Sequence, residues 1–294
     1  MKLSIDRLIK LIPEWNGKSI KINKINSGLT NINFEVIVGK KSFFLSIPDS
    51  ESLNINYDNK YYNNKICGET NISPRVIYFV EGENLLVTEF IKSKESSLAM
   101  FQSSKEIENL VGTIKILHNA KPFLKNFNMF NQMSVFQNIL KGDLLPKNIV
   151  KYLSEIKILK QKLHIQKDKV VPCHNDLISE NIIIKNNQIL VVDFDYSGNN
   201  DACFELGNLS VEMEYDDEQI NKLVKYYYGK INEDIISRIN LQGIVSDIGW
   251  SLWSYVQVKN SKLDFDYESY AINRLERAIN KMESEEYKLW INNI

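Results

Sequence analysis

The chain has 294 residues, of which 44% are hydrophobic, enough for the core of one large domain or of two lobes. Its 36 basic and 37 acidic side chains give a formal net charge of −1. That balance argues against a nucleic-acid-binding protein and against binding to an anionic membrane surface. No stretch approaches the length of a membrane span, and residues 1–7 carry charge where a signal peptide needs an apolar run.

Cysteine usage indicates a reducing compartment. The three cysteines, Cys67, Cys173 and Cys203, are scattered, odd in number and without a C-x-x-C spacing. This pattern argues against a disulfide framework and against a zinc site. We therefore expect a cytoplasmic protein.

The first third of the chain is predicted to be rich in strands. A helix is expected at 4–12 and a polar helix at 53–69, because of the spacing of their side chains. Runs of β-branched and aromatic residues bounded by turn residues predict strands at 20–22, 33–38, 42–47, 74–79 and 85–91.

Two short stretches in this part suit a nucleotide. The turn Ser27-Gly28-Leu29-Thr30-Asn31 lies between two strands, where backbone amides can lie over phosphates. A single glycine is also common in an ordinary hairpin. Glu89-Phe90-Ile91 follows the last strand, and its exposed backbone groups can pair with an adenine edge; an ordinary edge strand is the alternative.

After about residue 92 the strand signals fade and helices dominate. Apolar residues at helical spacing predict helices at 105–119, 135–140, 149–163, 202–214, 218–228, 233–259 and 267–283. No internal repeat and no low-complexity linker interrupts them.

The strongest motif lies within this helical part. His174-Asn175-Asp176 is followed by Asn181 and then, after two β-branched runs around an Asn-Asn turn, by Asp193-Phe194. In a phosphotransferase with this pattern, the first aspartate accepts the proton of the attacking hydroxyl, and the asparagine and second aspartate hold Mg²⁺. Asp176, Asn181 and Asp193 fit these roles. The structural alternative is a tight turn and a buried hairpin that the polar residues only cap.

The order of elements and the motif together predict an α+β fold with two lobes, of the protein-kinase-like type. A small β-rich lobe at 1–91 would bind the nucleotide. A larger, mainly helical lobe at 92–294 would carry the catalytic and substrate-binding residues. Asn175 stands where protein kinases place an arginine that clamps a phosphorylated loop, so the pattern favours a small-molecule kinase. His174 is interpreted as structural, and His118 and His164 carry no functional signal.

From Ser27 to about Ala278 the chain resembles the choline/ethanolamine kinase family. The resemblance rests on the 27–31 turn, the H-N-D motif with Asn181, Asp193-Phe194-Asp195-Tyr196, and the segment from Phe204 to Glu212. Its most specific part is Trp250-Ser251-Leu252-Trp253 with the aromatic stretch from Phe265 to Tyr270. The resemblance implies ATP and Mg²⁺ as cofactors, a phosphate loop at 27–31, and an amino alcohol as substrate.

The resemblance also implies a site for the ammonium group. Its members are aromatic rings and one carboxylate: Tyr196, Glu212, Trp250, Trp253, Phe265 and Tyr270. A quaternary ammonium has no N–H to donate, so aromatic faces recognise it best. Trp250 and Trp253 share one helical face, although a tryptophan pair on an apolar helix is also common in a core. Tyr215 is a looser candidate.

Two positions depart from the family pattern. Ser46 lies where the third strand usually carries a cation that reaches the phosphates, and Lys60 lies where the next helix usually carries the glutamate that pairs with it. Our hypothesis is that Lys60 replaces the lost cation at the nucleotide.

We therefore expect ATP-dependent phosphorylation of choline or ethanolamine, without nucleic-acid or membrane partners. A degenerate kinase that only binds a ligand or partner, and an aminoglycoside-type phosphotransferase, are the alternatives. The sequence leaves open choline against ethanolamine, the oligomeric state, and whether the product serves phospholipid metabolism or the decoration of surface sugars.

Overall fold

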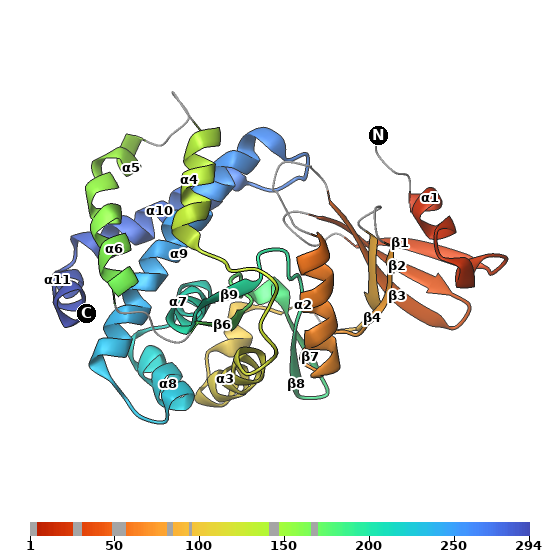
Figure 1. Ribbon diagram of the computed structural model, residues 1–294, viewed down its shortest axis with the longest axis horizontal. Coiled ribbons are helices and arrows are strands. Elements are labelled where there is room, and N and C mark those ends of the chain that lie inside the picture. The colour runs from red at the N-terminus through yellow and green to blue at the C-terminus, as the bar shows by residue number, and fades with distance from the viewer. Residues whose placement is uncertain are drawn as a thin grey trace.

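The computed structural model describes residues 5–25, 31–48, 57–80, 85–93, 96–140, 147–165 and 170–294. The strands of residues 20–89 gather at one end of the molecule, and helices fill the other end (Figure 1). The predicted α+β arrangement, with a strand-rich N-terminal part and a helical C-terminal part, is confirmed. The boundary between residues 91 and 92 stays a prediction.

The N-terminal part is built on one antiparallel sheet of five strands in the order β1-β2-β3-β5-β4. Its strands are β1 (Ile20–Ile25), β2 (Asn31–Val38), β3 (Lys41–Pro48), β4 (Val76–Val80) and β5 (Leu85–Glu89). Gly39, with a φ of 61°, makes the turn between β2 and β3, where a left-handed backbone suits glycine. All five predicted strands are confirmed, with shifts at their ends.

The apolar side chains of this sheet pack against the first helical segments, α1 (Ile5–Lys10) and a 3₁₀ helix at Pro13–Trp15. The Trp15 ring is buried there, with its centroid 5.1 Å from that of Phe43 and 5.8 Å from that of Tyr78. This small core belongs to the N-terminal part alone and holds the sheet as a unit.

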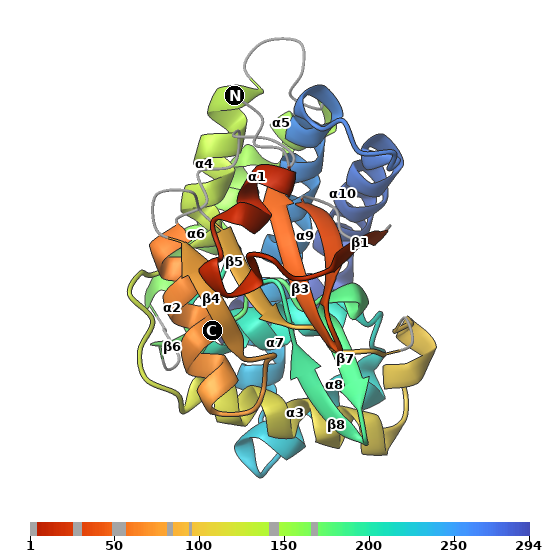
Figure 2. The same cartoon turned by 90° about the vertical axis from the view of Figure 1, so that its right-hand side faces the viewer.

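Helix α2 (Tyr57–Glu69) confirms most of the predicted polar helix, of which 53–56 lie outside the described residues. It lies beside the β4 edge of the sheet (Figure 2). Its polar side chains are buried because they face the C-terminal part: the Nδ2 atoms of Asn59 and Asn63 donate to the carbonyl oxygen of Ser197, at 2.9 and 3.2 Å. Helix α2 therefore brings Lys60 toward the segment that follows Asp193.

The C-terminal part is an assembly of helices around α9. They are a 3₁₀ helix at Leu98–Phe101, α3 (Ser104–His118), α4 (Met129–Ile139), α5 (Lys147–Lys151), α6 (Leu153–Ile165), α7 (Ala202–Glu212), α8 (Asp217–Tyr228), α9 (Glu233–Asn260), α10 (Tyr267–Glu283) and α11 (Glu285–Asn293). Helix α9 has 28 residues and is buried over most of its length. Within the described ranges, no helix is both long and apolar enough to cross a membrane.

Helices α7 and α9 touch backbone to backbone. A Cβ at Gly207 would lie 2.6 Å from the carbonyl oxygen of Ile239 and 2.8 Å from the nitrogen of Gly243. Only glycine fits there without moving one of the helices. This close crossing fixes α7 under the loop that carries the H-N-D motif.

Two short sheets frame that loop. The hairpin of β7 (Ile182–Lys185) and β8 (Gln188–Val191) was predicted, and Asn186 and Asn187 make its turn with φ values of 51° and 62°. The pairing of β6 (Val170–Cys173) with β9 (Gly198–Asp201) was not predicted. The sequence Gly-Asn-Asn-Asp of β9 has no apolar alternation, so its strand character comes from the tertiary structure.

Candidate active site

Helix α7 holds the loop of the H-N-D motif from below. The two carboxylate oxygens of Glu205 accept the backbone N–H groups of His174 and Asn175, at 2.7 and 2.6 Å. The Oδ1 atom of Asn208, one turn further along α7, accepts the N–H of Leu177 at 2.8 Å. These bonds fix the backbone on both sides of Asp176.

The first two residues of the motif are structural. His174 is buried, its Nε2 lies 2.7 Å from the carbonyl oxygen of Val192, and burial lowers its pKa, which keeps the ring neutral. Asn175 has a φ of 69° and donates through Nδ2 to the carbonyl oxygen of Tyr196 at 3.0 Å, while its Oδ1 accepts from Asn200 at 2.9 Å. Asparagine tolerates this left-handed backbone, and its amide crosslinks the two halves of the site.

The hairpin brings the three predicted catalytic residues together. The N–H of Val192 donates to the carbonyl oxygen of Asn181 at 2.9 Å, which places Asp193 beside Asn181. The Nδ2 of Asn181 in turn donates to the backbone oxygen and the Oδ2 of Asp176, at 2.9 and 3.3 Å. Asp193 itself has a φ of 67°, an uncommon backbone conformation for an aspartate.

Burial and mutual repulsion raise the proton affinity of these carboxylates. Burial is the main cause that raises the pKa of Asp176 well above its usual value, and the charges of Glu212 and Asp193 add to it. Burial and then the charge of Asp195 raise the pKa of Asp193 to about 7. A cluster of acids with raised pKa values is typical of a functional site.

The donor atoms of this cluster fit a magnesium ion. The Oδ1 of Asp193 is buried and has no hydrogen-bond partner within the described part of the chain. Asn181 uses its Nδ2 on Asp176, so its Oδ1 takes no part in that contact. Carboxylate and amide oxygens are ligands that Mg²⁺ prefers, and a cation would relieve the repulsion that raises the pKa of Asp193.

On the N-terminal side, Lys60 reaches the segment after Asp193. Its Nζ forms an ion pair with Oδ1 of Asp195, and the Nδ2 of Asn31 donates to Oδ2 of the same carboxylate at 3.0 Å. The side chains of Lys60 and Asp195 are only 10% and 2% exposed. Ser46 lies on β3 opposite Leu86 and supplies no charge. The predicted replacement cation is thus next to the acid cluster, and its contact with phosphates stays a prediction.

The other predicted nucleotide contacts are placed less completely. Residues 27–30 of the predicted phosphate loop lie outside the described residues, and Asn31 opens β2. The N–H of Glu89 donates to the carbonyl oxygen of Arg75 at 2.9 Å, and its side chain pairs with Arg75. An adenine contact at this residue would therefore fall to its carbonyl oxygen, and Ile91 follows it.

The predicted aromatic residues form one continuous cluster. We call it the aromatic cluster; its members are Tyr196, Trp250, Trp253, Phe265, Tyr267 and Tyr270. Neighbouring rings meet edge to face, with centroids 4.8 Å apart for Tyr196 and Trp250 and 6.0 Å apart for Trp250 and Trp253. The Nε1 of Trp253 donates to the hydroxyl of Tyr196 at 2.7 Å. Tyr267 was not predicted as a member.

That last bond connects the aromatic cluster to the acid cluster, because Tyr196 follows Asp193 by three residues. Glu212, the predicted carboxylate of this site, is 9% exposed and is bound by Arg274, whose Nη2 lies 2.7 and 2.5 Å from its two oxygens. Tyr215, the looser candidate, lies in a different part of the core, where its hydroxyl donates to the carbonyl oxygen of Phe101 at 3.0 Å.

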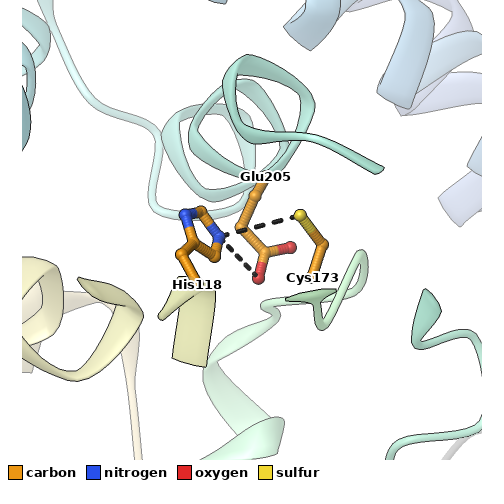
Figure 3. A group of neighbouring side chains, drawn as sticks. All are labelled: His118, Cys173 and Glu205. Atoms are coloured by element: carbon orange, nitrogen blue, oxygen red, sulfur yellow. Dashed lines mark hydrogen bonds and ion pairs between the residues drawn. The ribbon is translucent and has the colours of Figure 1, made fainter. Parts of the chain in front are cut away.

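Below the loop, His118, Cys173 and Glu205 point toward one another from α3, β6 and α7 (Figure 3). The Nε2 of His118 lies 3.8 Å from Glu205 and 3.7 Å from the Sγ of Cys173. Burial keeps the pKa of Cys173 well above its usual value, so the thiol is protonated, and both oxygens of Glu205 accept loop N–H groups. The group is an anchor of the loop rather than a metal site, and the sequence interpretation missed the part of His118.

The chain is similar to known kinases along most of its length. The family model described as choline/ethanolamine kinase matches residues 22–279. Protein LicA of Haemophilus influenzae is 22% identical over 87% of this chain and 78% of its own length. Ethanolamine kinase 1 of Mus musculus is 23% identical over 96% of this chain and 89% of its own length.

Solved structures share the fold. A choline/ethanolamine kinase family protein from Mesorhizobium loti has a TM-score of 0.83 at 24% identity, with 97% of this chain and 96% of that chain covered. A spectinomycin phosphotransferase has a lower TM-score of 0.58 at 14% identity, with both chains covered completely. The fold is therefore the protein-kinase-like fold. Because the family match covers most of the residues, this chain belongs to the choline/ethanolamine kinase family of phosphotransferases.

Proposed function

We propose that the protein transfers the terminal phosphoryl group of ATP to the hydroxyl of choline or ethanolamine. One observation carries the proposal: the hydrogen bond from Trp253 to Tyr196 ties the aromatic cluster to the segment that carries Asp193. A ligand whose cation lies against these rings would have its hydroxyl, two carbons away, directed toward Asp176. Such positioning is a large part of catalysis in phosphoryl transfer.

Asp176 is the proposed base. Its carboxylate would orient the substrate hydroxyl and accept its proton as the oxygen bonds to phosphorus, and the raised pKa of Asp176 favours proton uptake. The bond from Asn181 to Asp176 Oδ2 holds the carboxylate in one orientation. Asn181 and Asp193 would hold Mg²⁺, which when bound neutralises charge on the phosphates. Lys60 and the 27–31 loop are the proposed phosphate contacts.

The aromatic cluster favours an amino alcohol as the acceptor. Rings recognise a trimethylammonium group by cation–π attraction, which contributes about 0.5–2 kcal/mol for each stacked ring. An aminoglycoside carries several ammonium groups and would require several acids facing it. The carboxylate next to the aromatic cluster, Glu212, is already bound by Arg274.

The test is the release of ADP from Mg-ATP with choline, ethanolamine, kanamycin or no acceptor. We expect turnover that depends on choline or ethanolamine and stops when EDTA removes the metal. Turnover with kanamycin alone would support the aminoglycoside alternative. Folded protein that binds choline but releases no ADP would support a degenerate kinase, the alternative that the Ser46 and Lys60 changes motivate.

A further inference from the structure

Arg274 of α10 lies under the aromatic cluster, and the sequence interpretation did not single it out. It is 5% exposed. Its Nη2 bonds both oxygens of Glu212 on α7, and its Nη1 lies 3.2 Å from Oδ1 of Asp247 on α9. Its guanidinium carbon lies 4.4 Å from the ring centroid of Tyr270. One side chain thus contacts three helices and a ring of the aromatic cluster.

These contacts outweigh the cost of burying the charge. Burial alone would lower the pKa of Arg274, but the charges of Glu212 and then Asp247 hold it well above its usual value. Arg277 completes the network, with its Nε and Nη2 at 2.8 and 2.5 Å from the oxygens of Asp247. Two arginines therefore face two acids, and the network is electrically balanced.

A continuous path of hydrogen bonds leads from Arg274 to the proposed base. Oε1 of Glu212 also accepts from the Nδ2 of Asn208 at 3.2 Å. The Oδ1 of Asn208 accepts the N–H of Leu177, the residue that follows Asp176. The orientation of Glu212 is therefore coupled both to the aromatic cluster and to the catalytic loop.

We propose that Arg274 is a positioning residue of the amino-alcohol site, an inference that rests on the proposed function. Its fork fixes the carboxylate of Glu212 in one orientation, and its face supports the ring of Tyr270 from below. An arginine fork does this by geometry, which the point charge of a lysine does not reproduce. Arg274 thereby sets how tightly the ammonium head is held, without touching the nucleotide.

Binding of tetramethylammonium tests this directly, because this ion has the head group but no hydroxyl to phosphorylate. Its dissociation constant is measured from the fluorescence of Trp250 and Trp253. Arg274→Met should weaken binding about tenfold. Arg277→Met is the matched control: it removes a cation from the same network without a contact to Glu212, and it should change binding less than about threefold.

A purely structural role is separated by further readouts. With Arg274→Met, the KM for the amino alcohol should rise while the KM for ATP and the affinity for a fluorescent ATP analogue stay unchanged. Arg274→Lys keeps the charge in the network and should still bind tetramethylammonium more weakly than the Arg277→Met control. Should Arg274→Met fail to fold, Arg274→Lys decides the question.

The outcomes are distinct. Equal binding by Arg274→Lys and the wild type, or equal losses with the variants at 274 and 277, would overturn the role of Arg274. A parallel loss of ATP affinity would also overturn it, because the effect would then be general. A wild-type protein that neither binds tetramethylammonium nor phosphorylates an amino alcohol would instead overturn the proposed function.

Discussion

The two sides of the proposed reaction site are built differently. On the amino-alcohol side, rings from α9 and α10 pack directly on one another above a buried ionic network. On the nucleotide side, the contacts to the segment after Asp193 are polar: Lys60 and Asn31 bind Asp195, and Asn59 binds Ser197. Packed rings are fixed before a ligand arrives, whereas polar partners can be exchanged for ligand oxygens. The departures from the family pattern, Ser46 and Lys60, lie on the exchangeable side.

Replacing the proposed base should have the largest effect. Asp176→Asn removes the proton acceptor that both sides serve, so kcat should fall roughly 10³-fold while tetramethylammonium binding is kept. Initial rates of ADP release measure this. Asp264→Asn, at an exposed position, is the control. A kcat for Asp176→Asn within about tenfold of the wild type would contradict the assignment of the base.

The anchor below the loop should matter next, because it supports both sides together. Glu205→Gln leaves one side-chain oxygen where two loop N–H groups bind, and it should lower the free energy of unfolding by about 2 kcal/mol. Urea denaturation measures this. Glu218→Gln, whose side chain is 76% exposed, should cost less than about 0.5 kcal/mol. Equal stability of the two variants would show that Glu205 does not hold the loop.

Lys60→Met tests the nucleotide side alone. Loss of the cation should raise the KM for ATP about tenfold and leave the KM for the amino alcohol unchanged. Lys65→Met is the matched control, since Lys65 lies on the exposed face of the same helix. If the variant at 60 behaves like the variant at 65, Lys60 serves only as a partner of Asp195.

Trp253→Phe tests the amino-alcohol side alone and should have the smallest effect. It keeps a ring but loses the Nε1 bond to Tyr196, so the KM for choline should rise about fivefold with an unchanged KM for ATP. Trp290→Phe on α11 serves as the control. A rise in the KM for ATP instead would mean that the two sides are not independent.

The parts predicted from the sequence are those with a local pattern. The hairpin between Asn181 and Asp193 follows from two β-branched runs around an Asn-Asn turn, and its geometry brings the predicted acids together. Trp250 and Trp253 follow from helical spacing. The strands of the N-terminal sheet follow from alternation and turns.

The parts that could not be predicted depend on contacts between distant residues. Arg274 has no local signal, because its partners Glu212 and Asp247 are 62 and 27 residues away. His118 looked like an ordinary helical residue until α3 brought it to Glu205. Helix α4 begins at Met129 rather than near residue 135, because the Asn128 side chain caps it, and α11 was not predicted.

The most direct test of the account is phosphorus NMR of the products formed from Mg-ATP and choline or ethanolamine. The account predicts a phosphomonoester resonance that grows in step with ADP in the wild type and is lost in Asp176→Asn. ADP that appears together with inorganic phosphate alone, or an ester formed equally well by Asp176→Asn, would contradict it.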